Sequence, residues 1–276
     1  MADKKTIFPF MSVPERTTKP RTTGLTIVSD GDYRVSIPGA HWTEDLVDWG
    51  VQWIDYYKLT HTIMFQPRAF VLKKLEVVRK NGIQLCAGGN TMETAVMQDC
   101  VEPFFDELQN LGIDALEVSS AVSAFTIEQK IALIEKARAR GFTVFSKVGK
   151  KLLDANGSQS RMSTSRVIYE MTECLKAGAF KAVYESAAIS QLEAEDSLGS
   201  LVEIAAAIGK QKIIFDLPHG DWHSGAAQCK NSCAAFFVLQ FGSNVNIGDV
   251  EPTQVMSLET LRGGLSARTL GRIPLV

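Results

Sequence analysis

Residues 115–148 read ALEVSSAVSAFTIEQKIALIEKARARGFTVFSKV, and the order of residues in this stretch predicts a strand, a helix and a second strand. Ala115–Ser119 and Thr143–Val148 are short runs rich in apolar and β-branched residues, as in buried strands. Between them, 127–140 carries apolar residues at helical spacing, and Gly141 is a residue type that commonly ends a helix. Strands joined in this way are parallel neighbours in one sheet.

The same unit recurs along the whole chain. The predicted strands are 24–28, 53–58, 84–87, 115–119, 143–148, 182–185, 212–216 and 244–247. The predicted helices begin near 43 and 67 and then span 92–110, 127–140, 164–177, 198–208, 226–239 and 252–262. Eight strand–helix units in sequence order indicate an α/β fold, a single (β/α)8 TIM-type barrel.

We assign this barrel to residues 21–276 and an extended, proline-bearing N-terminal arm to residues 1–20. A doubly wound open sheet has the same alternation and is the alternative. No G-x-G-x-x-G follows the first predicted strand, so the usual dinucleotide-binding signal is missing. We expect the arm to pack against a neighbouring copy, which predicts a homo-oligomer.

The composition is that of an ordinary globular protein. Of the 276 residues 45% are hydrophobic, the net charge is −2, and no block of Lys and Arg predicts nucleic-acid binding. No apolar run approaches the roughly 20 residues that cross a bilayer, and the N-terminus lacks the apolar core of a secretory leader. The five scattered cysteines favour reduced thiols and a cytoplasmic location. A small molecule is therefore the expected partner.

Polar residues stand where the predicted strands end. In a barrel of this type the chemistry lies at the C-terminal ends of the strands, so these residues are the candidates for the site. They are Asp30, Lys58, the turn Gly88-Gly89-Asn90, Glu117, Lys147, Glu185, Asp216 and Asn246. Charges within apolar strands are costly unless they are paired or used. A structural ion pair, or an outward position between strand and helix, is the alternative for each one.

The residue types indicate a metal and an anion. Carboxylate oxygens suit Mg²⁺, and we predict Mg²⁺ or Mn²⁺ bound by Glu117, Glu185 and Asp216. Lys58 and Lys147 can hold an anion or carry a proton, because burial and neighbouring charges change the pKa of a lysine. The predicted substrate is thus a small anionic acid.

The segment after the last predicted strand is a candidate phosphate grip. Barrels often bind phosphate with the loops that follow strands seven and eight, and Asn246 and Gly248 begin that segment here. Gly248 allows the backbone to approach a ligand closely. Asp249, which is acidic, works against this assignment.

A second constellation follows the seventh predicted strand. His219, His223, Cys229 and Cys233 are residue types that zinc accepts, but their spacing matches no structural zinc pattern. The two cysteines, four residues apart, fit one buried helical stripe equally well. We predict no zinc and treat His219 as a loop residue that contacts substrate. No G-x-S-x-G elbow supports a Ser-His-Asp hydrolase.

The order of these motifs resembles the phosphosulfolactate synthase family. The resemblance runs from about residue 19 to 269 and is carried by Lys19-Pro-Arg21, Gly24-Leu-Thr26, Asp30, Asp55-Tyr-Tyr-Lys58, Gly88-Gly-Asn-Thr-Met-Glu93, Leu116-Glu-Val-Ser119, Val148-Gly-Lys150, Glu185-Ser186, Asn244-Val-Asn-Ile-Gly248 and Leu258-Glu-Thr-Leu-Arg-Gly-Gly-Leu265.

The resemblance implies a barrel enzyme that adds sulfite to phosphoenolpyruvate in a Mg²⁺-dependent reaction. It agrees with a catalytic set of Lys58, Lys147, Glu117 and Glu185. The residues expected to bind substrate are Arg21, Asp30, Gly88, Gly89, Asn246, Gly248 and His219.

The chain also departs from the family pattern. The turn after Lys58 is Leu59-Thr-His61-Thr62 instead of Gly-Trp-Gly-Thr, and Lys147 stands where the family tends to have glutamate. A charge reversal of this kind changes which anion fits, or removes a metal site. Three hypotheses follow: a phosphosulfolactate synthase or close relative, a divergent barrel lyase on another small anion, and a non-catalytic relative like the plant heat-stress-associated proteins.

Overall fold

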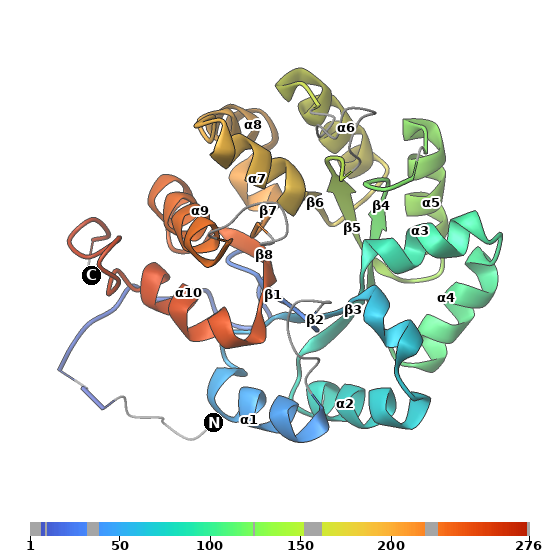
Figure 1. The fold of residues 1–276 in the computed structure, drawn as a ribbon, viewed down its shortest axis with the longest axis horizontal. Coiled ribbons are helices and arrows are strands. Elements are labelled where there is room, and N and C mark those ends of the chain that lie inside the picture. Colours follow the sequence, from blue (N-terminus) through green and yellow to red (C-terminus); the bar gives the residue numbers. More distant parts are fainter. Residues whose placement is uncertain are drawn as a thin grey trace.

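The computed structural model describes residues 7–8, 10–31, 39–123, 125–151, 162–218 and 226–274. Figure 1 shows strands in the middle of the molecule with helices around them. The strands form a closed parallel barrel in sequence order, from β1 to β8 and back to β1. The predicted TIM-type barrel is therefore confirmed, and the open-sheet alternative is excluded.

The eight strands are short and almost completely buried. They are β1 Thr26–Ser29, β2 Tyr56–Leu59, β3 Gln84–Ala87, β4 Ala115–Ser119, β5 Thr143–Val148, β6 Lys181–Tyr184, β7 Ile213–Asp216 and β8 Asn246–Val250. The bounds of β3, β4 and β5 are those predicted from the sequence. The predicted eighth strand, 244–247, was wrong by two residues at its start and three at its end.

The helices lie outside the strands. They are α1 Ala40–Gly50, α2 Arg68–Lys80, α3 Gly89–Met97, α4 Val101–Asn110, α5 Ile127–Ala139, α6 Thr164–Lys176, α7 Ser186–Ala194, α8 Ser200–Ile208, α9 Ala226–Phe241 and α10 Val255–Arg262. Within the described residues they are accompanied by three 3-10 helices, η1 His61–Phe65, η2 Lys210–Lys212 and η3 Pro252–Gln254.

One predicted helix is two helices in the structure. The single helix expected over 92–110 ends at Met97 and resumes at Val101. Between them Asp99 has a φ of 50°, a left-handed conformation that interrupts an α-helix. A second addition is α7, which starts directly after β6 and was not predicted.

Two apolar layers hold the barrel together. The inner layer fills the barrel interior with side chains that lie in, or directly before, strands β1 to β7. They are Leu25, Ile27, Tyr56, Cys86, Ala115, Phe145, Val183 and Ile214. The outer layer packs the other faces of the strands against the helices. Because successive side chains of a strand point to opposite faces, the next inward position of each strand lies two residues later.

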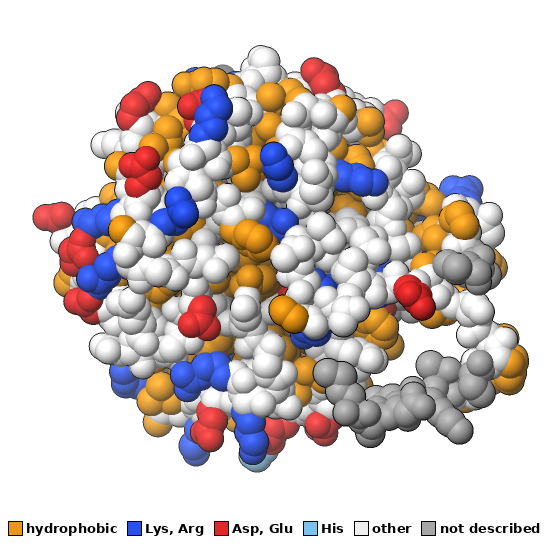
Figure 2. Space-filling view, turned by 180° about the vertical axis from the view of Figure 1, so that it is seen from behind, with side chains coloured by type: hydrophobic (Ala, Val, Ile, Leu, Met, Phe, Trp, Pro, Cys, Tyr) orange, Lys and Arg blue, Asp and Glu red, His pale blue; other side chains and the backbone are white. Residues whose placement is uncertain are grey.

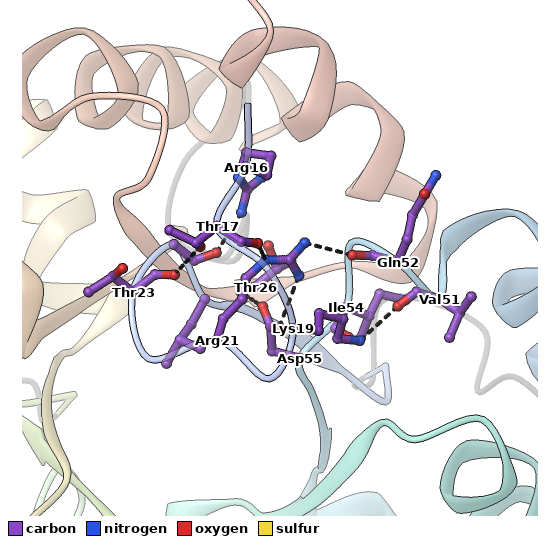
Figure 3. A network of polar contacts seen from close by, with 12 residues as sticks. Arg16, Thr17, Lys19, Arg21, Thr23, Thr26, Val51, Gln52, Ile54 and Asp55 are labelled. Atoms are coloured by element: carbon purple, nitrogen blue, oxygen red, sulfur yellow. Dashed lines mark hydrogen bonds and ion pairs between the residues drawn. The ribbon is translucent and has the colours of Figure 1, made fainter. Parts of the chain in front are cut away.

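The segment 16–21 crosses the end of the barrel where the strands begin (Figure 3). Lys19 donates to the carbonyl of Val51, 2.8 Å away, and Arg16 pairs with Glu259. Arg21 Nη1 lies 3.0 Å from Oδ1 of Asp55, the residue just before β2. This part of the predicted arm is therefore bound to the end of the barrel that lies opposite to the C-terminal ends of the strands.

Apolar side chains in the described part of the arm are exposed. Phe8, Phe10 and Met11 are 55%, 79% and 63% exposed, and these apolar side chains are of the kind that pack on another surface. The homo-oligomer stays a prediction. On the face seen in Figure 2, basic and acidic side chains are interspersed. Of the helices that the structure describes, none is both long and apolar enough to cross a bilayer.

Candidate active site at the barrel mouth

Charged side chains occupy the inward positions directly above the inner apolar layer. Lys58 follows Tyr56 by two residues on β2, and Lys147 follows Phe145 in the same way on β5. Glu117 and Asp216 stand two residues after Ala115 and Ile214. The alternation of each strand thus brings these charges to one end of the barrel, where Glu185 joins them from the start of α7.

Six charged residues form the mouth cluster, all with exposed fractions of 0–4%. They are Lys58, Glu117, Lys147, Glu185, Asp216 and Asp249. Five of the six are residues for which the sequence predicted a functional role. Such a concentration of buried charge is costly and is found mainly at functional sites.

Lys58 lies at the β1–β2 side of the mouth cluster. Its Nζ donates to Oε1 of Glu117 at 2.9 Å and also contacts Oδ1 of Asp249. The other oxygen of Glu117 accepts from the backbone N–H of Gly89 at 3.1 Å. Each oxygen of Glu117 therefore has a donor, which fixes the orientation of this carboxylate.

Lys147 lies among the remaining carboxylates. Its Nζ is 2.7 Å from Oδ2 of Asp216 and 3.3 Å from Oε2 of Glu117. Oε2 of Glu185 and Oδ2 of Asp249 follow at 3.6 Å and 3.8 Å. One ammonium group thus has carboxylate oxygens from four different parts of the barrel around it.

Asp249 reaches the mouth cluster through a bulge in β8. The pairing of β1 with β8 runs from Thr26–Ile247 to Val28–Val250, so β8 advances three residues while β1 advances two. Asp249 has a φ of 50°, which is uncommon for a residue other than glycine. Because of the extra residue, the side chain of Asp249 points toward the mouth cluster and not outward toward the helices.

Sequence reasoning missed Asp249 as a member of the site. Its Oδ1 accepts from the hydroxyl of Ser29 at 2.8 Å and contacts Lys58. Regular alternation after Gly248 would have turned Asp249 outward, and no residue type in the sequence signals the bulge. The only available signal was the unexplained acid beside Gly248.

Both lysines of the mouth cluster are held in the charged form. Burial alone would lower their pKa, but the carboxylates outweigh it. Asp249 and Glu117 raise the pKa of Lys58 above its ordinary value. Asp216 and then Glu117 raise the pKa of Lys147 well above its ordinary value. The two ammonium groups therefore act as permanent positive charges.

Two carboxyl groups of the mouth cluster differ in charge state. Burial, and next the negative charge of Asp249, raises the pKa of Asp216 to about 8. Burial acts on Glu185 in the same direction, but Lys147 and Lys151 lower the pKa of Glu185 to about 2. At neutral pH Glu185 is a carboxylate, whereas Asp216 carries a proton. Such a separation is how one site provides an acid beside an ionised carboxylate.

One oxygen on each of these two groups lacks a hydrogen bond from the residues that the structure describes. Asp216 Oδ2 and Glu185 Oε2 are buried and accept no hydrogen bond from the residues that the structure describes. Asp216 Oδ2 is close to Lys147 Nζ, but the contact lacks hydrogen-bond geometry. Buried oxygens without a hydrogen bond are costly and are characteristic of catalytic or ligand sites.

Three of the predicted glycines allow close approach at the mouth. A Cβ on Gly248 would overlap the carboxylate of Asp216, and a Cβ on Gly89 would lie 2.5 Å from Cβ of Ser119. A Cβ on Gly88 would lie 2.9 Å from the carbonyl oxygen of Leu59. These glycines shape the site by their lack of a side chain.

Two predicted substrate-binding residues lie at the end of the barrel away from the mouth cluster. Arg21 binds Asp55 at the opposite end of the barrel, because its segment precedes β1 (Figure 3). Asn246, the first residue of β8, donates from Nδ2 to the carbonyl of Ile213 at 2.8 Å, where β7 begins. Neither side chain is brought to the mouth cluster.

Asp30 forms a separate buried ion pair outside the barrel wall. It accepts from the hydroxyl of Tyr57 at 2.6 Å and pairs with Lys74 of α2 at 2.5 Å. This is the structural alternative that the sequence left open for each charged strand end. The predicted contact of His219 with substrate concerns a residue outside the described residues, as does His223.

The predicted metal ligands do not surround an open centre. Mg²⁺ prefers carboxylate oxygens at about 2.0–2.1 Å around an open centre. In the mouth cluster that centre holds Lys147 Nζ, and no three His, Cys, Asp or Glu side chains of the described chain are arranged to hold an ion. Mg²⁺ at Glu117, Glu185 and Asp216 stays a prediction that this geometry does not support.

The cysteines of the zinc alternative lie on α9. Cys233 is fully buried in the outer apolar layer, and Cys229 is half-buried one turn earlier. Their placement matches the buried helical stripe that the spacing also allowed.

Comparisons with known proteins place this arrangement in context. Residues 14–268 match the family model for (2R)-phospho-3-sulfolactate synthase. The phosphosulfolactate synthase of Methanothermobacter thermautotrophicus is 30% identical over 275 residues, covering 97% of this chain and 99% of the relative. Phosphosulfolactate synthases of Methanocaldococcus jannaschii and Bacillus subtilis are 28% and 26% identical and cover 91% and 94% of this chain.

Solved structures support the fold. The carboxyl transferase domain of Rhizobium etli pyruvate carboxylase, with 3-hydroxypyruvate, matches 90% of this chain and 44% of that chain at 14% identity and a TM-score of 0.54. Thiamine phosphate pyrophosphorylase from Pyrococcus furiosus matches 87% of this chain and 96% of that chain at 12% identity and a TM-score of 0.50. At such identities the likeness shows the barrel alone.

Proposed function

This chain belongs to the (2R)-phospho-3-sulfolactate synthase family and is an enzyme of the carbon–sulfur lyase type, and from that premise we propose that it adds sulfite to phosphoenolpyruvate. The family's product name supports the choice of substrates. It describes a three-carbon acid with phosphate on C2 and sulfonate on C3, which is what addition of sulfite to C3 of phosphoenolpyruvate gives.

The proposed step is a conjugate addition. The sulfur lone pair of sulfite forms the C3–S bond while the C2=C3 π bond breaks. The electron pair moves to C2 and into the adjacent carboxylate, and a proton then adds to C2. The step needs positive charge near the substrate carboxylate and an acid near C2, because charge develops on the first and is discharged at the second.

Lys58 and Lys147 are the proposed sources of positive charge. Both are buried, both remain ammonium groups at neutral pH, and both are fixed by carboxylates. Fixed charges of this kind stabilise a developing anion more than water does, because they need no reorganisation. This pair of buried ammonium groups at the strand ends is the observation that carries the proposal.

Asp216 is the proposed acid. It carries a proton at neutral pH, since burial and Asp249 raise its pKa to about 8. A group whose pKa lies near the working pH both holds a proton and releases it readily. After transfer to C2, Asp216 regains its proton from solvent as the product leaves.

A less anionic enol acid is the second candidate substrate. Both buried ammonium groups of the mouth cluster are already paired with carboxylates, which leaves less positive charge for a substrate phosphate. This observation supports a divergent barrel lyase as the second candidate function. If no enol acid reacts, the hypothesis that remains is a non-catalytic relative.

The test follows the phosphorus atom. Wild-type protein is incubated with phosphoenolpyruvate and sulfite, and ³¹P NMR records conversion of the enol phosphate to an alkyl phosphate. We expect wild-type protein and Lys74→Met to form product and Lys58→Met to fail, since Lys74 is equally buried but pairs with Asp30 outside the barrel. Unphosphorylated enol acids in parallel reactions test the second candidate. No product from any enol acid would end the enzymatic proposal.

A further inference from the structure

Four carboxyl groups surround the ammonium group of Lys147. Carboxylate oxygens of Asp216, Glu117, Glu185 and Asp249 lie 2.7, 3.3, 3.6 and 3.8 Å from its Nζ. These four groups come from or directly follow β7, β4, β6 and β8. Carboxylates are the groups that commonly hold divalent cations, but here they surround an ammonium, and no three of them are arranged around a centre that could hold an ion.

We propose that Lys147 replaces the divalent cation of this site, so that the reaction runs without a bound metal. The inference rests on the proposed function for the reaction, and on the geometry of the mouth cluster for the absence of a metal. Lys147 is covalently part of β5, so its charge stays in the site throughout turnover.

Steric and electrostatic effects both oppose a metal beside Lys147. A divalent ion bound to the same oxygens would lie about 2.0–2.1 Å from them. It would therefore compete for the volume that the ammonium fills at 2.7–3.8 Å from those oxygens. Where the two did coexist, they would be like charges a few ångströms apart in a buried site, which is strongly unfavourable.

The charges of the site nearly balance without a metal. Lys151, with 25% of its side chain exposed, lies 3.5 Å from Oε1 of Glu185 and adds a third ammonium group to Lys58 and Lys147. These three ammonium groups face the four carboxyl groups of the mouth cluster. At most one negative charge is therefore left without a positive partner, which is little to attract a divalent cation.

The inference is tested with Mn²⁺ as the probe. Wild-type protein is stripped with EDTA and titrated with Mn²⁺, and bound metal is measured by electron paramagnetic resonance without any substrate. Lys147→Ala removes the ammonium and leaves its four carboxylates. Lys74→Ala is the matched control, because it removes an equally buried lysine that faces only one carboxylate, Asp30.

We expect no Mn²⁺ binding by wild-type protein or Lys74→Ala, and binding by Lys147→Ala at least about 100-fold tighter than by wild type. A Lys147→Ala protein that folds only when Mn²⁺ is present, as seen by circular dichroism, is an equivalent positive result. Stoichiometric Mn²⁺ binding by wild-type protein would overturn the inference, as would equal affinities of Lys147→Ala and Lys74→Ala. If Lys147→Ala folds under neither condition, the wild-type titration decides alone.

The two proposals fail in different ways. EDTA-stripped wild-type protein is expected to keep its full rate with phosphoenolpyruvate and sulfite. If the stripped protein is inactive and added Mn²⁺ restores it, the inference about Lys147 fails and the proposed function stands. If no product forms under any condition while wild-type protein binds no Mn²⁺, the proposed function fails and the role of Lys147 as a fixed cation stands.

Discussion

The ammonium of Lys147 on β5 lies 2.7 Å from a carboxyl oxygen of Asp216 on β7, although β6 separates the two strands. The two side chains meet because both occupy inward positions above the inner apolar layer. Despite this neighbour, burial and Asp249 keep the pKa of Asp216 at about 8. The pH dependence of turnover should therefore follow the ionisation of Asp216.

Asp216→Asn should remove the proposed acid. Wild-type turnover is expected to be level below pH 8 and to fall about tenfold per pH unit above it, as Asp216 loses its proton. The variant should lose about 10²–10⁴-fold in turnover and show no inflection near pH 8. Rates measured from pH 6 to 10 check this. An unchanged inflection in Asp216→Asn would assign the proton to another group.

The same group should affect stability with a definite sign. The pKa of Asp216 is raised in the folded protein from an ordinary 3.8 to about 8, so between these pH values the folded state binds more protons than the unfolded state. The stability contributed by Asp216 is therefore present below pH 4 and is lost as pH rises through 8. Urea unfolding at pH 6 and pH 9 should show a smaller loss for Asp216→Asn than for wild type.

Asp249→Asn should lower the pH at which activity is lost. After burial, the negative charge of Asp249 is the largest cause of the raised pKa of Asp216, so its removal eases ionisation of Asp216. The basic limb of the turnover profile should move below pH 8. Asp106→Asn, an exposed carboxylate on α4, is the control and should leave the limb in place. A limb that moves upward in Asp249→Asn would contradict the charge model.

Gly248→Ala should disturb the site through its backbone. The added Cβ would overlap the carboxylate of Asp216, so that side chain or β8 must shift. We expect a loss of about 1–3 kcal/mol in unfolding free energy and a displaced pKa for Asp216. Gly199→Ala is the control, since no heavy atom lies within 4 Å of a Cβ there. Equal stability of the two variants would show that the mouth can absorb the extra atom.

Arg21→Ala should affect stability and leave catalysis intact. Arg21 and Asp55 form a pair with 5% and 4% of their side chains exposed, at the end of the barrel away from the mouth cluster. Breaking a buried pair costs about 3–5 kcal/mol, whereas Arg68→Ala, which breaks an exposed pair with Glu107, should cost within about 1 kcal/mol. Urea unfolding measures both. A changed KM for substrate in Arg21→Ala would show that Arg21 does contribute to substrate binding.

The sequence was sufficient for the fold and for most of the mouth cluster. Strands such as Ala115–Ser119 were recognisable because they are short apolar runs between clear helix signals. Lys58, Glu117 and Lys147 were recognisable because a charged residue within an apolar strand is costly unless it is paired or used. The same rule also selected Asp30, which pairs with a helix lysine, since residue type alone does not state which face of a strand is inward.

The rest depended on backbone geometry that residue types do not encode. Gly248 was interpreted as the start of a loop, whereas β8 continues to Val250. Arg21 belongs to a recognisable motif, but a motif does not show that its segment precedes β1 and so lies at the far end of the barrel. Neither position could be derived from periodicity.

The bulge in β8 also makes the chemistry of this barrel depend on a chain length. Loss of Val250 would restore an even pleat with β1, pair Asp249 with Val28 and turn the side chain of Asp249 toward the surrounding helices. The mouth would then lose a carboxylate even though every acidic codon remained intact. In this protein a deletion without any substitution is therefore enough to change the charge of the active site. A sequence alignment that places a gap in β8 indicates a relative whose mouth lacks this carboxylate, even where the aspartate itself is present.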